Sequence, residues 1–188
     1  MTAPNRPLLP LLTDRLRLRP LREADFEQLC VLYEDPRVEQ FIGPHSRVEV
    51  QEELRFDIAH QARHGWALWA TEQLAGERLL GVCGLRPLQM RGPEVELGYD
   101  LHPDYWGRGY ASEAARAAVA LGLGPLGIDR VIAVVKEHHS ASRRVLEKAG
   151  LRHVGRRRAY DEDLLLYEVR RAPEALGEAN AMRRRSSP

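Results

Sequence analysis

The stretch HPDYWGRGYASEA, residues 102–114, has the composition of a loop that binds an anion. Its glycines, Gly107 and Gly109, lack a Cβ atom, so the backbone can approach a ligand closely. An alanine-rich helix pattern follows, and the first N–H groups of a helix have no intrahelical partner and favour phosphate. The guanidinium of Arg108 can add a charge-assisted contact. The expected anion-binding residues are Gly107, Arg108, Gly109, Tyr110, Ala111 and Ser112. Taken alone, the stretch also fits a tight turn without a ligand.

Two common phosphate-binding loops do not fit this stretch. The sequence contains no GxxxxGK[ST] run, so a Walker A loop is excluded. The dinucleotide fingerprint GxGxxG needs a third glycine where Ser112 stands, and its first glycine directly follows a strand. Here residues 102–106 separate the preceding strand pattern from Gly107. We therefore expect a pyrophosphate site of another kind.

A second part of the site is expected downstream, in VIAVVKEHHSASRRVLEKAGL, which predicts a strand, a polar junction and a helix. If the strand at residues 129–137 pairs in parallel with that at 94–101, the helices that follow both strands begin at one edge of the sheet. Two parallel strands that separate there leave unpaired N–H and C=O groups. A thin amide-bearing arm could bind in that slot as an added strand does. Pantetheine is such an arm, and its pyrophosphate would reach the glycine loop.

The elements that position these residues follow from hydrophobic periodicity. The predicted order is β-α-α-β-β-β-α-β-α-β-β, and strands alternate with helices only in the second half. That order favours an α+β fold with a mixed sheet and one parallel crossover. The predicted strands span 15–21, 66–71, 78–88, 94–101 and 129–137, followed by two closing strands at 151–160 and 164–171 that form a hairpin around residues 160–163. The predicted helices span 22–35, 48–63, 111–123 and 140–149.

Composition limits the class of protein. The 188 residues carry 29% charged and 44% hydrophobic side chains with a net charge of +1, so no global field draws the chain to nucleic acid or to a membrane. Cys30 and Cys83 are far apart and lie in apolar surroundings, which favours two buried thiols in a reducing cytoplasm and no metal site. We expect one domain over residues 8–171 and a flexible tail over 172–188.

Three segments resemble the GNAT acetyltransferase superfamily: LTDRLRLRPLREADFEQL, VELGYDLHPDYWGRGYASEA and SRRVLEKAGLRHVG. The nearest branch is similar to the ribosomal-protein-alanine N-acetyltransferases RimJ and RimL. The resemblance covers about residues 13–171. It implies the GNAT fold, a mostly antiparallel sheet with a central splayed parallel strand pair and helices on both faces. It also implies acetyl-CoA as donor and an amine, a protein N-terminus or a small molecule, as acceptor.

The resemblance also assigns residues. The family loop reads Gln or Arg, two residues, Gly, one residue, then Gly or Ala; Gly109 and Ala111 match, and Trp106 stands at the first position. The strand before the loop supplies backbone groups to pantetheine, which maps to Tyr99 and Leu101. His139 takes the place of a usual Asn, and Ser142 matches a Ser. The position of the tyrosine acid found in other members is occupied here by Leu146.

The implied chemistry needs a neutral amine, a donor to the oxyanion and a proton or hydrogen bond for the leaving thiolate. Glu96 is the expected base, although it also fits a salt-bridged strand glutamate, and Glu94 is a weaker alternative. Ser142 could donate to the thiolate or cap a helix. His139 could bind pantetheine, stabilise sulfur or relay a proton, or it could simply be exposed at a helix start.

The sequence therefore predicts a cytoplasmic, acetyl-CoA-dependent N-acetyltransferase without a metal, and leaves a homodimer open. Because the usual Asn and Tyr are absent, a non-catalytic acyl-CoA-binding sensor of the same fold is the alternative. A pure protein-interaction domain, in which the loop is only a turn, is a third and weaker reading.

Overall fold

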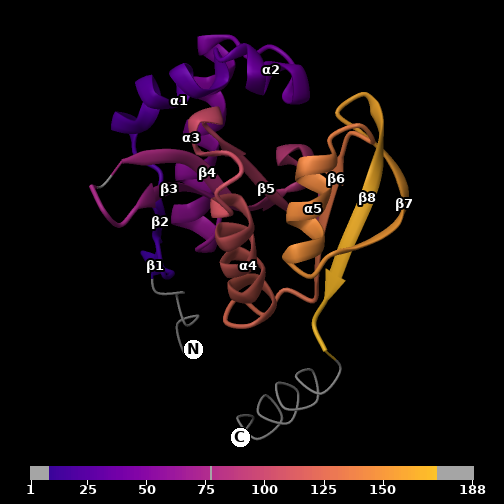
Figure 1. Ribbon diagram of the computed structural model, residues 1–188. Helices are drawn as coiled ribbons and strands as arrows, with labels where there is room; N and C mark the ends of the chain where they lie inside the picture. The colour runs from indigo at the N-terminus through magenta and orange to yellow at the C-terminus, as the bar shows by residue number, and fades with distance from the viewer. Residues whose placement is uncertain (1–8, 77, 173–188) are drawn as a thin grey trace, which may run out of the picture.

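The computed structural model describes residues 9–76 and 78–172 (Figure 1). These residues form an eight-stranded sheet in the order β1-β2-β3-β4-β5-β6-β8-β7. The β5–β6 pair is parallel and the other neighbouring strands are antiparallel. The strands are β1 (Leu11–Leu12), β2 (Leu16–Pro20), β3 (Leu68–Gln73), β4 (Leu79–Pro87), β5 (Val95–Leu101), β6 (Arg130–Val135), β7 (Arg152–Ala159) and β8 (Glu162–Arg170). This mixed sheet with one parallel pair confirms the predicted α+β class.

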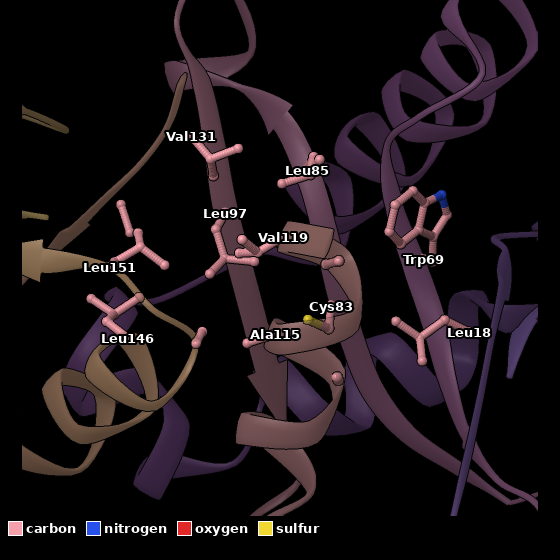
Figure 2. Packing of buried hydrophobic residues seen from close by; sticks show 14 of the residues in the cluster. Leu18, Trp69, Cys83, Leu85, Leu97, Ala115, Val119, Val131, Leu146 and Leu151 are labelled. Atoms are coloured by element: carbon pink, nitrogen blue, oxygen red, sulfur yellow. The ribbon is translucent and has the colours of Figure 1, made fainter. Parts of the chain in front are cut away.

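The helices pack on both faces of the sheet. Their bounds are α1 (Phe26–Tyr33), α2 (Pro36–Ile42), α3 (Arg47–His64), α4 (Tyr110–Leu123) and α5 (Ser140–Lys148). On one face, side chains of α1 and α3 share a core with alternate residues of the sheet such as Leu68 and Val82. On the other face, α4 and α5 bury Ala115, Val119 and Leu146 against the sheet (Figure 2). The sheet is therefore covered on both sides, as the fold class requires.

Both cysteines lie in this interior, as predicted, and so does Trp69. Cys30 belongs to the first of the two cores, whereas Cys83 and Trp69 belong to the second. Trp69 is fully buried, and its indole N–H donates to Gln61 at 2.7 Å. These side chains stabilise the sheet and take no part in the site.

Local signals explain where the N-terminal helices begin. The hydroxyl of Ser46 accepts from the N–H of Glu49, whose carboxylate bonds back to Ser46, and this capping box starts α3. Gly65 ends α3 with a φ of 82°. The short helix α2 was not predicted, although Asp35 caps it and a proline occupies its first position. Helix α2 carries Phe41, which lines the cavity described below.

Three boundaries differ from the sequence prediction. Helix α5 spans Ser140–Lys148 with His139 as its N-cap residue, so it ends one residue before the predicted bound at 149. Strand β1 was not predicted because two residues are too short for a period-two signal. The hairpin turn consists of Tyr160 and Asp161, both with positive φ. The flexible tail predicted for residues 172–188 lies almost entirely outside the described residues.

Candidate active site

A cavity of about 620 Å³ opens where β5 and β6 separate. One side, here called the cofactor wall, consists of residues 106, 107 and 109–112 and residues of α5 such as Ser142. The opposite side, the acceptor wall, consists of His45, Glu53, Arg86, Glu96, Asp100 and Tyr160. All six side chains of the acceptor wall line the cavity. The two walls meet at the parallel strand pair.

The slot between the two strands is the centre of the cavity. Parallel pairing is confined to Val95 with Val131 and Glu96 with Ile132. Beyond these positions β5 continues along β4, and β6 continues along β8, so their facing edges part. Residues 97–101 and 133–135 line the cavity at this point. An extended amide-bearing group can complete the ladder there.

The glycine loop exposes backbone N–H groups to the cavity. Gly107 and Gly109 have φ values of 74° and 81°, a region that costs an L residue strain. The intrahelical bonds of α4 begin with the N–H of Glu113 to the carbonyl of Gly109. The preceding N–H groups of Tyr110, Ala111 and Ser112 thus have no helical partner, and no side chain of the described residues caps them. This helix start can hold an anion.

The side chains of Arg108 and Trp106 do not contribute to the anion site as the sequence predicts. The guanidinium of Arg108 is exposed over the ring of Tyr105, 6.0 Å from its centroid, and is absent from the cavity wall in the described structure. The indole N–H of Trp106 donates to the carbonyl of Leu101 at 2.6 Å. Trp106 therefore fixes the start of the loop and occupies one lone pair of Leu101, and the anion site is built mainly from backbone.

Basic side chains that the sequence reading did not select line the cavity instead. Lys136 follows β6, and Arg144 and Lys148 project from α5. Lys136 is held by Glu162 at 3.1 Å. These cations can attract the phosphates of a large anionic ligand.

Ser142 lies in the first turn of α5 and is joined to β5. Its hydroxyl lies 2.7 Å from the hydroxyl of Tyr99, which also lies 3.0 Å from the Ser142 carbonyl. The side chain of Tyr99 is half-buried, and this burial raises the pKa of its hydroxyl. Both hydroxyls therefore stay protonated at neutral pH. The Ser142 hydroxyl is oriented by its partner rather than used as a helix cap.

His139 forms part of the cavity wall. Its imidazole stacks on Phe41 of α2 with ring centroids 3.6 Å apart and planes 8° apart, and His138 lies more loosely against the same ring. Burial and the neighbouring His138 lower the pKa of His139 to about 4. The ring is neutral at physiological pH, which disfavours it as a proton donor and favours a packing role.

Glu96 lies at the last paired position before the strands part. It is 6% exposed, and its carboxylate accepts the Tyr160 hydroxyl at 2.5 Å and the N–H of Val134. Burial raises the pKa of Glu96, against the opposing effects of Tyr160 and Arg86. A buried carboxyl with a raised pKa, facing a cavity, has the properties of a general base.

Other charges surround Glu96 on the acceptor wall. Arg86 donates to Glu53 at 2.9 Å, and His45 lies 3.7 Å from the same carboxylate. Burial would raise the pKa of Glu53, but His45 and Arg86 lower it to about 2. Asp100 has only a long contact, 3.4 Å from the Tyr33 hydroxyl, and burial raises its pKa. On the acceptor wall, three carboxyl groups therefore face the cavity together with one arginine.

Glu94, the weaker candidate for the base, lies outside the cavity. Its carboxylate is held by Arg130 at 3.0 Å and by Arg157. The basic run at residues 152–158 lies on edge strand β7, where Arg156 pairs with Asp163 and Glu137. The side chain of Arg156 thus forms ion pairs on the surface of the sheet edge.

Comparisons with known proteins match this geometry. The family model described as Acetyltransferase (GNAT) domain matches residues 15–152. The uncharacterized N-acetyltransferase YoaA of Bacillus subtilis is 30% identical over 158 residues, which cover 81% of this chain and 89% of that protein. The chain belongs to the GNAT acetyltransferase family.

Solved structures extend the comparison. An acetyltransferase from Agrobacterium tumefaciens has a TM-score of 0.76 and 28% identity, covering 85% of this GNAT chain and 92% of its own. The aminoglycoside acetyltransferase AAC(6')-Ib, solved with coenzyme A, has a TM-score of 0.69, covering 88% and 99% of the two chains. At 16% identity the latter shows the shared fold alone.

The residues present in this GNAT chain fit acetyl-CoA, the donor that the family uses, and the predicted cofactor is confirmed at that level. The parted edges of β5 and β6 offer backbone groups to the amides of pantetheine. The uncapped start of α4 offers N–H groups to a pyrophosphate. Of the residues predicted to bind the cofactor, all but Arg108 line the cavity: Tyr99, Leu101, Trp106, Gly107, Gly109, Tyr110, Ala111, Ser112, His139 and Ser142.

The sequence analysis did not identify several residues that line the cavity of this GNAT chain. Arg86 carried a signal, since a charged residue in the apolar strand pattern RLLGVCGLRPL needs a partner. Glu53 and His45 carried none, because both resemble ordinary polar residues of a surface helix and loop. The sequence around Tyr160 predicts a hairpin turn but gives no signal for a place in the cavity. Phe41 lies on α2, which was itself missed.

The described residues contain no cluster of three or more His, Cys, Asp or Glu side chains able to hold a metal ion. A membrane-spanning helix is likewise absent from the part of the chain that the structure describes.

Proposed function

We propose that this GNAT protein transfers an acetyl group from acetyl-CoA directly to a primary amine, either a protein N-terminus or a small molecule. The observation that carries the proposal is the position of Glu96. Its buried carboxyl belongs to the acceptor wall and faces the cavity at the point where the strands part, next to a wall suited to CoA.

The acceptor wall supplies proton chemistry. A protonated amine cannot attack, and amines titrate at about 8 to 10 in water. Glu96 accepts that proton, directly or through water, and its raised pKa brings it closer to the pH at which it works. Glu53 and Asp100 add negative charge that attracts a cationic acceptor.

The cofactor wall holds the donor and receives the leaving group. Acetyl-CoA bound there would supply the acetyl group, and the leaving group would be the thiolate of CoA. In the arrangement in which Tyr99 donates to the Ser142 hydroxyl, the Ser142 proton is available to the sulfur, and the positive end of α5 adds to this effect. His139, flat against Phe41, packs beside the pantetheine arm.

The sensor alternative is less well supported, because a module that only binds acyl-CoA has no need of a buried carboxyl at the reacting end of its cavity. We also propose membership of the branch similar to RimJ and RimL, on the strength of the VELGYDLHPDYWGRGYASEA motif. A single domain over residues 8–171 and a cytoplasmic location belong to the same proposal.

An amine-acceptor screen with acetyl-CoA tests the proposed function. Thiol release is followed for α-amino peptides, diamines and amino sugars, and each product is identified by mass. We expect acetylated product with at least one acceptor class and a strong loss in Glu96→Gln. Release of thiol without any acetylated amine, or tight acetyl-CoA binding with no turnover for every class, would favour the sensor.

A further inference from the structure

The turn between β7 and β8 reaches back over the acceptor wall. Tyr160 and Asp161 form it with φ values of 50° and 59°. Both residues have left-handed backbone, which glycine and asparagine adopt far more readily than tyrosine. A tyrosine at such a position is strained, and strained residues persist where the surrounding contacts fix them. The strained backbone of Tyr160 therefore indicates that the contacts of its side chain hold it in place.

The phenol of Tyr160 is held from two directions. It donates to the Oε2 atom of Glu96 at 2.5 Å, and its oxygen accepts the backbone N–H of Gln89 at 3.3 Å. Gln89 lies in the irregular segment after β4 and itself has a φ of 55°. Two strained segments, one after β4 and one after β7, thus converge on this hydroxyl.

We propose that Tyr160 is a positioning residue for the base: its hydroxyl orients the Glu96 carboxylate towards the acceptor and keeps it ionised. This inference rests on the proposed function of Glu96. Tyr160 stays protonated, because burial raises its pKa, and its proton is donated to Glu96. Its effect on the reaction passes through Glu96 alone.

The other groups that face Glu96 do not replace this contact. Val134 on β6 donates a backbone N–H, Arg86 on β4 contributes positive charge, and Asp100 on β5 contributes negative charge. Behind them, Arg86 is bonded to Glu53 of α3, which also faces His45. Among the described residues, the hydroxyl of Tyr160 makes the only side-chain hydrogen bond to the Glu96 carboxylate. Its removal should raise the pKa of the carboxyl.

The test compares Tyr160→Phe with wild type in pH–rate profiles at saturating acetyl-CoA. The acid limb of kcat should move up by about one to two pH units, the size of one hydrogen bond to a charged group. KM for acetyl-CoA should not change, and most of kcat should return at high pH. Tyr167→Phe is the matched control, because it removes a tyrosine hydroxyl from β8 outside the cavity.

Two further measurements separate this inference from the proposed function. In a Glu96→Gln background, Tyr160→Phe should cause no additional change in the profile. Carbon-13 NMR of the Glu96 carboxyl gives its pKa without turnover, and Tyr160→Phe should raise it by the same one to two units. An unmoved Glu96 pKa in a folded Tyr160→Phe protein overturns the positioning role. Absence of turnover in wild type overturns the proposed function and leaves the NMR result to decide the positioning role.

Discussion

The two walls of the cavity are built in different ways. The cofactor wall is formed largely by backbone groups from two short stretches of sequence, the loop before α4 and the start of α5. The acceptor wall is formed by side chains from α3, β4, β5 and the β7–β8 turn, and from the loop before α3. The first construction depends on conformation, and the second on the identity of each side chain.

This difference predicts how each wall responds to mutation. Backbone N–H groups survive most substitutions, so the cofactor wall should tolerate change except where a side chain blocks the loop. The acceptor wall contains buried charges that compensate one another, so the loss of one alters the pKa of the others. Binding of acetyl-CoA and removal of the amine proton should therefore be separable by mutation.

The largest effect is expected for Glu96→Gln. The amide keeps the shape of the side chain but cannot accept a proton, so kcat at neutral pH should fall about 100-fold. Because the wild-type carboxyl works only when ionised, the wild-type rate rises with pH through the Glu96 pKa, which lies above the ordinary value. The variant should lose that limb and regain part of its rate at high pH, where the amine is already neutral.

Glu94→Gln is the matched control for this pH–rate measurement, because Glu94 is ion-paired outside the cavity. It should keep wild-type kcat. An unchanged profile in Glu96→Gln, with or without a loss in Glu94→Gln, would remove Glu96 from the role of base.

The next largest effect is expected for Gly109→Glu, which places a carboxylate at the uncapped start of α4. Acetyl-CoA affinity, measured by calorimetry, should fall about 30-fold, equivalent to about 2 kcal/mol. Gly109→Ala is the control, because it shares the strain of a φ of 81° without the negative charge. Equal losses in the two folded variants would assign the effect to strain and contradict a phosphate site.

A smaller effect is expected for Ser142→Ala. Loss of one transition-state hydrogen bond at sulfur should lower kcat about tenfold, or about 1.4 kcal/mol. Tyr99→Phe, which removes the partner that orients Ser142, should cost about threefold in the same steady-state assay. If Ser142→Ala were kinetically silent, the leaving group would be served by another donor.

The smallest effect is expected for His139. Because burial lowers its pKa to about 4, its charge should not change between pH 5 and pH 8, and it should add no limb to the profile. His139→Ala should raise KM for acetyl-CoA about threefold through lost packing on Phe41, and His139→Asn, the usual family residue, should be tolerated. Abolished turnover at unchanged KM in His139→Ala would instead make the histidine the acid.

The contrast between the walls also decides what could be read from the sequence. The loop of residues 107–112 was predictable because glycine spacing and a helix start are local signals. Glu96 was predictable because β5 alternates, which places its carboxyl opposite Leu97. The fold class followed from the order of the elements.

The remaining contacts depend on long-range geometry. Tyr160 reaches Glu96 only because β8 lies next to β6 and the hairpin turn is left-handed at both residues. Arg86 meets Glu53 only because α3 packs against the face of β4 on which Arg86 lies. No motif with a fixed sequence spacing indicates either contact, because the two residues of each pair come from separate elements. The Asp35-Pro36 start signal of α2 was local but was overlooked.

The separation of the two walls is tested most directly by a calorimetric titration of acetyl-CoA into Glu96→Gln. If Glu96 serves only the amine, the dissociation constant should equal that of wild type within about twofold, a difference of about 0.4 kcal/mol. A loss of affinity as large as that of Gly109→Glu would place the Glu96 carboxyl on the cofactor side of the cavity and contradict the division.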